Sequence, residues 1–331
     1  MSLDATAMQS LDDVRNTAAK IRARVKQSVM GRDDMIELVL IALFADGHVL
    51  LEDYPGSGKT TLAKALGQSI VDDLPDDDIP DFRRIQFTPD LLPSDVIGVM
   101  IFDTQSSTFQ FRRGPVFAYV VLVDEINRTS PKVQSALLEA MAEKQVTVDN
   151  ICYKLNELFF VIATQNPLDA VGTYPLPMAQ LDRFLFKLVM KHIDRDSELE
   201  VLRAWGHPHT EQPLPRVNRG DVVAARRLVR SAVQVHPLIH ESLVDIAQTL
   251  RDDKRARQGV STRCLVQAIP ALQTRAMLHD RDFVSSEDIR ALAVPLFAHR
   301  MDAGSQGVER VIQDALQRPL DALSRMTLRQ A

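Results

Sequence analysis

A short apolar run, a glycine-containing loop and a helix follow one another at residues 50–61 and constrain this chain more than any other stretch. The run is Leu50–Glu52, the loop spans 53–59, and helical residues continue from Leu62. Gly56 and Gly58 let the backbone take positive φ angles and approach an anion at low cost. The amide groups of such a loop, and of the helix that follows it, point at negative charge. The stretch therefore predicts a strand, a phosphate-binding loop and a helix.

The loop also carries the side chains that phosphate binding needs. Lys59 is placed to reach the β- and γ-phosphates, and Thr60 to put a hydroxyl on Mg²⁺. Asp53 stands where the full pattern has glycine, and aspartate tolerates left-handed backbone better than most residues. The alternative is a purely structural strand–turn–helix. The predicted nucleotide-binding residues of the loop are Asp53, Tyr54, Pro55, Gly56, Ser57, Gly58, Lys59, Thr60 and Thr61.

The composition is that of a soluble globular protein of one to three domains. The 331 residues are 45% hydrophobic and 25% charged, and the net charge of −5 argues against a general nucleic-acid coat. The two cysteines, Cys152 and Cys264, have no metal-ligand spacing and are expected to be reduced thiols. The sequence shows no signal peptide and no apolar run near 18 residues, so we expect a cytoplasmic protein without membrane insertion.

Periodicity predicts an α/β fold in the first part of the chain. Val120–Val123 is a continuous β-branched run, typical of a parallel sheet covered on both faces. Further strands are expected at 50–52, 84–88, 159–164 and 184–190, helices at 9–30, 33–44, 62–70 and 131–142, and hairpins at about 98–112 and 145–155. The acidic residues between 72 and 81 predict a solvated loop, with an ion or partner site as the alternative.

The remainder of the chain is predicted to be helical. We expect an α/β domain at 1–192, a proline-containing linker at 193–215 and an α-helical domain at 216–331. Helices are expected there at 221–233, 238–251, 262–278, 286–298 and 307–326.

Polar side chains follow the predicted core strands. Asp124 and Glu125 end one strand, and Asn166 follows another. The carboxyl ends of parallel strands form the edge where ligands bind. Successive strand residues point to opposite sides, so Asp124 and Glu125 should act differently, one on a metal and one towards a water. Val29–Arg32, with Gly31, is either a helix connection or a segment that packs on an adenine ring.

Taken together, these motifs resemble those of the MoxR family of AAA+ ATPases. The resemblance is carried by the stretch 84–95 (Arg-Ile-Gln-Phe-Thr-Pro-Asp-Leu-Leu-Pro-Ser-Asp) and by 172–184, which ends in Leu181-Asp182-Arg183-Phe184. The family-specific parts are Gln86–Ser94 and 172–184. The phosphate loop at 53–60, the stretch 121–128 and the stretch 162–167 complete the resemblance over about residues 10–300. It implies a five-stranded parallel sheet between helices, followed by an all-α lid domain.

The resemblance also implies roles for individual residues. Lys59 and Thr60 would bind phosphates and Mg²⁺, with Asp124 supporting the metal, and Glu125 would be the general base. Asn166 would hold the attacking water near the γ-phosphate. Arg183 matches an arginine finger that acts on the neighbouring subunit's nucleotide, and Arg263 a lid-domain sensor arginine. Arg128 is compatible with a second contact between subunits, and the hairpins either flank a ring's pore or are simple sheet edges.

The function that the resemblance implies is ATP hydrolysis in a ring, expected to be a hexamer. Such a ring would remodel or activate a client protein, for instance in metal-cofactor insertion or complex assembly, with a separate von Willebrand factor A (VWA) domain protein as partner. One alternative is an ATP-gated binding scaffold with little hydrolysis, and another is a chelatase-type motor subunit. A motor acting on DNA is disfavoured by the net charge.

Overall fold

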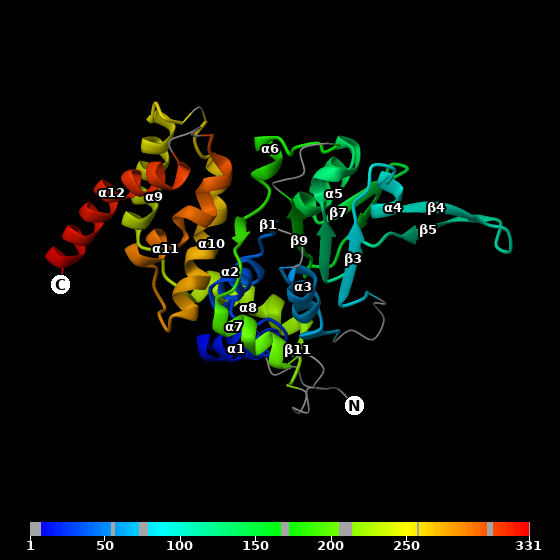
Figure 1. Ribbon diagram of the computed structural model, residues 1–331, viewed down its shortest axis with the longest axis horizontal. Helices are drawn as coiled ribbons and strands as arrows, with labels where there is room; N and C mark the ends of the chain where they lie inside the picture. Colours follow the sequence, from blue (N-terminus) through cyan, green and yellow to red (C-terminus); the bar gives the residue numbers. More distant parts are fainter. Residues whose placement is uncertain are drawn as a thin grey trace.

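A parallel five-stranded sheet lies at the centre of the molecule (Figure 1). The computed structural model describes residues 8–53, 57–72, 79–166, 172–204, 214–256, 258–302 and 307–330. The strands, in the spatial order β10–β1–β9–β6–β3, are β10 (Phe186–Met190), β1 (Val49–Asp53), β9 (Phe160–Gln165), β6 (Val120–Asp124) and β3 (Phe82–Gln86). Every neighbouring pair is parallel, so all five carboxyl ends meet at one edge. The predicted parallel sheet is confirmed.

Helices cover both faces of the sheet, which explains the apolar runs of the central strands. Leu51 and Leu122 belong to a core shared with α1 (Leu11–Ser28), α2 (Asp33–Phe44) and α3 (Lys59–Gly67). On the opposite face Leu50 and Val123 pack in a second core. It includes residues of α4 (Pro93–Ile97), η1 (Ile126–Arg128) and α5 (Pro131–Glu143). Because successive strand residues point to opposite faces, one run of apolar residues supplies both cores.

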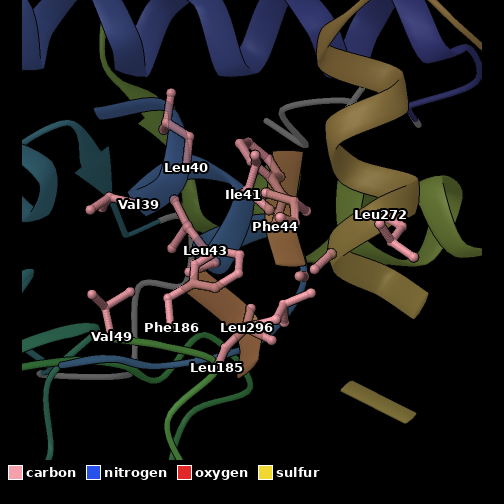
Figure 2. Packing of buried hydrophobic residues seen from close by; sticks show 14 of the residues in the cluster. Val39, Leu40, Ile41, Leu43, Phe44, Val49, Leu185, Phe186, Leu272 and Leu296 are labelled. Carbon is pink, nitrogen blue, oxygen red and sulfur yellow. The ribbon is translucent and has the colours of Figure 1, made fainter. Parts of the chain in front are cut away.

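The C-terminal helices are joined to the sheet through α2. Figure 2 shows Leu43 of α2 beside Phe186 of the sheet, with Phe44 of α2 and Leu272 and Leu296 of the C-terminal helices in the same group of side chains. These residues form one continuous buried cluster. The C-terminal helices are α8 (Arg219–Ala232), α9 (Pro237–Asp252), α10 (Thr262–Leu278), α11 (Ser286–Phe297), η2 (Ala298–Arg300) and α12 (Val308–Gln330).

Both predicted hairpins are confirmed. One is β4 (Gly98–Asp103) with β5 (Thr108–Arg113), and the other is β7 (Gln145–Val148) with β8 (Ile151–Lys154). The rings of Phe111 and Tyr153 stack between the hairpins with centroids 3.8 Å apart. The first hairpin extends away from the body of the molecule (Figure 1), and Phe102 and Phe109 are exposed on it. A role beside a pore stays a prediction.

The structure differs from the sequence prediction in several local elements. A helix not predicted from sequence, α7 (Arg195–Ala204), lies in the expected linker. The helix after the phosphate loop spans Lys59–Gly67 and not 62–70, because Gly58 provides the left-handed residue at which it begins. A two-residue parallel ladder pairs β2 (Ile70–Val71) with β11 (Val217–Asn218). The domain boundaries at 192 and 216 stay a prediction, and most of the acidic stretch, 73–78, lies outside the described residues.

Within the described ranges, no helix combines the length and the apolar character that crossing a membrane requires.

A buried histidine links the sheet to α5. His48 is 5% exposed, and its Nδ1 accepts a hydrogen bond from the Val161 amide at 3.1 Å. Its Nε2 lies 3.2 Å from the Met141 carbonyl oxygen, so this nitrogen carries the proton. Burial lowers the pKa of His48 to about 4 because the charged imidazolium is poorly solvated there. His299, also buried, has its pKa lowered in the same direction by burial and by the charge of Arg300.

We expect the free energy of unfolding to fall as the pH drops from 6.5 to 4. The unfolded chain protonates His48 near its ordinary pKa, whereas the folded chain protonates it only near 4, so the stabilisation is complete above 6.5 and lost towards 4. The pKa difference corresponds to about 3 kcal/mol. Urea unfolding at several pH values measures it. His48→Gln keeps a donor and an acceptor but does not titrate, so its acid slope should be shallower; an unchanged slope would refute the assignment.

Candidate functional site

The phosphate loop leads directly into the N-terminus of α3. Gly58 has φ +93° and is the N-cap of α3, and as a glycine it has no side chain with which to cap the helix. Among the described residues, a Cβ on Gly58 would meet no atom within 4 Å, so backbone conformation and not space calls for glycine. Lys59 starts the helix, and Thr60 and Thr61 are exposed in its first turn. The N-terminus of a helix directs its first amide groups, and the positive end of its dipole, towards the position where an anion would lie.

The described part of the predicted loop lies against the end of β10. Tyr54, Pro55 and Gly56 lie outside the described residues. Asp53 ends β1, opposite Met190 of β10. Ser57 contacts the same strand, since its hydroxyl lies 3.8 Å from the Met190 sulfur.

A cavity of about 450 Å³ adjoins the phosphate loop. Its lining comes from the loop and α3, from the segment between α1 and α2, and from α7 with the residues just before it. These lining residues are Ser28, Val29, Met30, Arg32, Ser57, Gly58, Thr61, His192, Ile193, Glu198, Val201 and Leu202. A cavity of this size, lined by both polar and apolar side chains beside a phosphate loop, is large enough for a nucleobase. This favours the interpretation of Val29–Arg32 as a segment that packs on an adenine ring.

Gly31 does not line this cavity, but its lack of a side chain allows two of the elements that form the cavity to pack together. Its φ is +68°, and a Cβ there would lie 2.4 Å from the Ser197 hydroxyl oxygen of α7. Only glycine allows α7 to pack so closely against the segment before α2. Gly31 lines a second hollow with Arg32 and Lys191.

Asp124 and Glu125 lie at the carboxyl edge of the sheet and are fixed by one threonine. The Thr164 hydroxyl, at the end of β9, donates to Asp124 Oδ1 at 3.3 Å and accepts from the Glu125 amide at 3.0 Å. Asp124 is buried, whereas Glu125 is partly exposed and has a left-handed backbone with φ +58°. Glu125 therefore lies just outside β6, so the alternation of side chains along a strand, from which different directions were predicted, does not extend to it. The different roles of the two carboxylates stay a prediction.

Side chains from β3 complete the surroundings of the two carboxylates. Gln86 is in register with Asp124, and its Nε2 donates to Glu125 Oε2 at 2.7 Å. Arg84 Nε donates to Asp124 Oδ2 at 2.6 Å. Arg128 Nε lies 3.3 Å from the same Glu125 oxygen. Glu125 is therefore oriented by neutral and cationic donors.

Asn166 follows β9, the strand between β1 and β6, and so lies at the same edge as Asp124. The residue before it, Gln165, donates from Nε2 to Glu52 Oε1 of β1 at 3.0 Å. Lys187 of β10 lies 3.0 Å from the other Glu52 oxygen. Glu52 thus connects β1 to side chains of both neighbouring strands, β9 and β10.

The donor set fits Mg²⁺ held jointly by protein and phosphates. Thr60 contributes an exposed hydroxyl and Asp124 a carboxylate, both oxygen ligands of the kind Mg²⁺ prefers. Among the described residues, no group of three or more His, Cys, Asp and Glu side chains forms a protein-only metal site. Use of Asp124 Oδ2 requires Arg84 to swing away, which its half-exposed side chain allows.

The two predicted arginines lie on different elements. Arg183 follows α6 (Met178–Leu181), and its Nη1 donates to the Leu138 carbonyl of α5 at 2.5 Å. Arg263 is exposed in the first turn of α10. Neither contacts Asp124 or Glu125 through a hydrogen bond described in the structure.

Several residues of this site were not predicted from the sequence. Thr164, Gln86 and Glu52 acquire their positions from strand register, which a single sequence does not reveal. The sequence signal that could have indicated these residues was the presence of polar residues at the ends of β3 and β9. The cavity residues of α7 had no signal, because the helix itself was not predicted.

Comparisons with known proteins agree with this architecture. A model of the ATPase family associated with various cellular activities (AAA) matches residues 48–186, and a model of the AAA lid domain matches residues 248–319. Protein YeaC of Bacillus subtilis is 46% identical over 291 residues, 88% of each chain. Chaperone MoxR1 of Mycobacterium tuberculosis is 34% identical over 291 residues, 84% of this chain and 73% of its own.

Similarity extends to a further relative and to a solved structure. Protein MoxR of Methylorubrum extorquens is 29% identical over 316 residues, 88% of this chain and 89% of its own. A crystal structure from Cytophaga hutchinsonii, assigned as an ATPase, superimposes with a TM-score of 0.83 at 34% identity, covering 93% of this chain and 96% of that one. With its sheet order, its phosphate loop and its helical C-terminal region, the chain belongs to the MoxR family of AAA+ ATPases.

Proposed function

We propose that this protein hydrolyses ATP with Mg²⁺ in an oligomeric ring and uses the energy to remodel or activate a client protein. The observation that carries the proposal is the meeting of Asp124, Glu125 and Asn166 at one sheet edge that also receives β1 and its phosphate loop. Phosphoryl transfer depends mostly on positioning and charge stabilisation, and this edge offers both.

Each side chain has a role in the proposed reaction. Lys59 and the first amides of α3 hold the phosphates, and Thr60 with Asp124 holds Mg²⁺, which when bound neutralises charge on the phosphate oxygens. Glu125 accepts the proton of the attacking water, and Asn166 positions that water. The base sits in the cavity lined by Val29 and Met30.

The proposal also includes a neighbouring subunit. Arg183 would reach the adjacent nucleotide, and Arg263 the nucleotide of its own subunit. Hydrolysis would then require assembly, with a hexamer as the expected state and a separate VWA-domain protein as partner. MoxR1, at 34% identity, is named a chaperone, which supports action on a client protein.

We expect ATP turnover per subunit to rise with protein concentration. Below the assembly concentration Arg183 has no neighbouring nucleotide, so the rate per subunit should be lower by about 10³-fold or more. Phosphate release, measured over a dilution series beside sedimentation of the same samples, tests this. Lys59→Ala, which loses its phosphate contact, is the inactive control. A rate per subunit that stays constant through disassembly would contradict the proposal.

A further inference from the structure

The residue before Arg183 ties its segment to the C-terminal helices. Asp182 Oδ2 accepts a hydrogen bond from the Ser261 hydroxyl at 2.9 Å, and Asp182 Oδ1 accepts one from Arg300 Nε at 2.7 Å. Ser261 is the N-cap of α10, and Arg300 ends η2. One carboxylate on the Arg183 segment therefore joins two separate elements of the helical region.

Arg300 adds further hydrogen bonds to this connection between the Arg183 segment and the helical region. Its side chain is 2% exposed, and it also donates to the carbonyl oxygens of Asp182, Phe184 and Leu185 at 3.3, 2.7 and 3.1 Å. A buried guanidinium with so many fixed partners has little freedom to move alone. The backbone on both sides of Arg183 must follow η2 when the helical region moves.

Ser261 also connects Asp182 to the helical turn that contains Arg263. The Ser261 hydroxyl that donates to Asp182 also accepts a hydrogen bond from the Cys264 amide at 3.1 Å, which fixes the first turn of α10. Arg263 lies within that turn and is exposed. Only the Asp182–Ser261 contact and one turn of helix separate the two arginines along this path.

We propose that Asp182 is a positioning residue that couples the helical region to Arg183. Resting on the proposed function, the coupling works as follows: a nucleotide that engages Arg263 shifts the first turn of α10, and Asp182 carries the shift to the segment of Arg183. This shift would break the hydrogen bond that Arg183 Nη1 donates to the Leu138 carbonyl. Nucleotide in one subunit would in this way set the arginine that faces the next subunit.

Hydrogen exchange measures this coupling without any need for hydrolysis. We expect Mg²⁺ with a non-hydrolysable ATP analogue to change exchange of the amides at 178–185 by about 5-fold or more, the lower end of ordinary coupling. Asp182→Asn keeps the shape but loses the charge, so the analogue should leave these amides unchanged. Analogue affinity, titrated separately, should match that of the unsubstituted protein.

Two further variants separate coupling from a merely structural role. Asp245→Asn, on an exposed carboxylate of α9, should respond like the unsubstituted protein. Ser261→Ala removes the hydrogen bond from Ser261 to Asp182 at an exposed site, and this variant should fold even if Asp182→Asn does not. Its exchange at 178–185 without nucleotide should stay as it was, and only the response to the analogue should be lost.

The outcomes distinguish this inference from the proposed function. A full response in Asp182→Asn and Ser261→Ala, or none in the unsubstituted protein with the analogue bound, would overturn the coupling. Absence of ATP turnover with an intact exchange response would refute the proposed hydrolysis alone. Absence of analogue binding would refute both.

Discussion

Glu125→Gln should abolish measurable ATP turnover while ATP still binds. Loss of a positioned general base costs about 10²–10⁴-fold in rate. Glutamine has the same shape, and its side-chain oxygen can still accept the hydrogen bond that Gln86 donates to Glu125 at 2.7 Å. The substitution therefore removes the proton acceptor and leaves the surroundings in place. Phosphate release and titration with a fluorescent ATP analogue measure the two quantities independently.

The matched control is Glu139→Gln, on an exposed position of α5, which should keep full turnover. Turnover of Glu125→Gln equal to that control would exclude Glu125 as the base. Turnover absent from the unsubstituted ring itself, with tight ATP binding, would favour an ATP-gated scaffold. Because the Glu125→Gln ring should stay in the ATP-bound state, it is also suited to retaining a client or a VWA-domain partner in a pull-down.

Arg183→Ala should lower turnover by about 10³–10⁵-fold, the value of an arginine that acts on a neighbour's phosphates. Its side chain also donates to Leu138 of α5, so simple loss of activity does not by itself show action between subunits. Mixing does. Subunits with Arg183→Ala retain Glu125, and subunits with Glu125→Gln retain Arg183. Rings mixed from both should regain turnover, because some intact sites receive an arginine from the adjacent subunit.

The mixing experiment has a clear opposite result. If Arg183 acts within its own subunit, neither variant contains a complete site, and mixed rings stay as inactive as each parent. Arg227→Ala, at an exposed position of α8, is the arginine control and should keep full turnover alone and in mixtures. Sedimentation of each sample confirms that the rings assemble.

Buried strands and long amphipathic helices were predictable from the sequence because their patterns are set by burial. All residues of β6 are buried, and the first four, Val120–Val123, form the continuous apolar run from which the parallel sheet was predicted. Helix α10 was predicted at 262–278 and lies at those residues, since its N-cap Ser261 and its buried face are both local signals. Asp124 and Asn166 were found because polar residues directly after buried strands are unusual.

Elements that are exposed or very short were not predicted from the sequence. No residue of α7 is buried, so its apolar residues Val201 and Leu202 gave no clear period although they line the cavity beside the phosphate loop. Strands β2 and β11 have two residues each, too few for any alternation. The partners of the carboxylates, Gln86 and Thr164, depend on which strands are neighbours and in what register, which is a property of tertiary structure.

The packing of α1 and α2 has a consequence for the chain during its synthesis. Helix α1 contacts α8 and α10, and Arg15 Nε donates to the Met277 carbonyl at 3.0 Å. Buried Arg226 of α8 donates to Leu43 at the end of α2 at 2.9 Å. Partners that lie so far downstream leave the ribosome about 10–50 s after the helices they cover, at 5–20 residues per second. Until then the apolar faces of α1 and α2 lack the part of their cover that α8 and α10 provide, so we expect these two helices to need protection from aggregation during that interval.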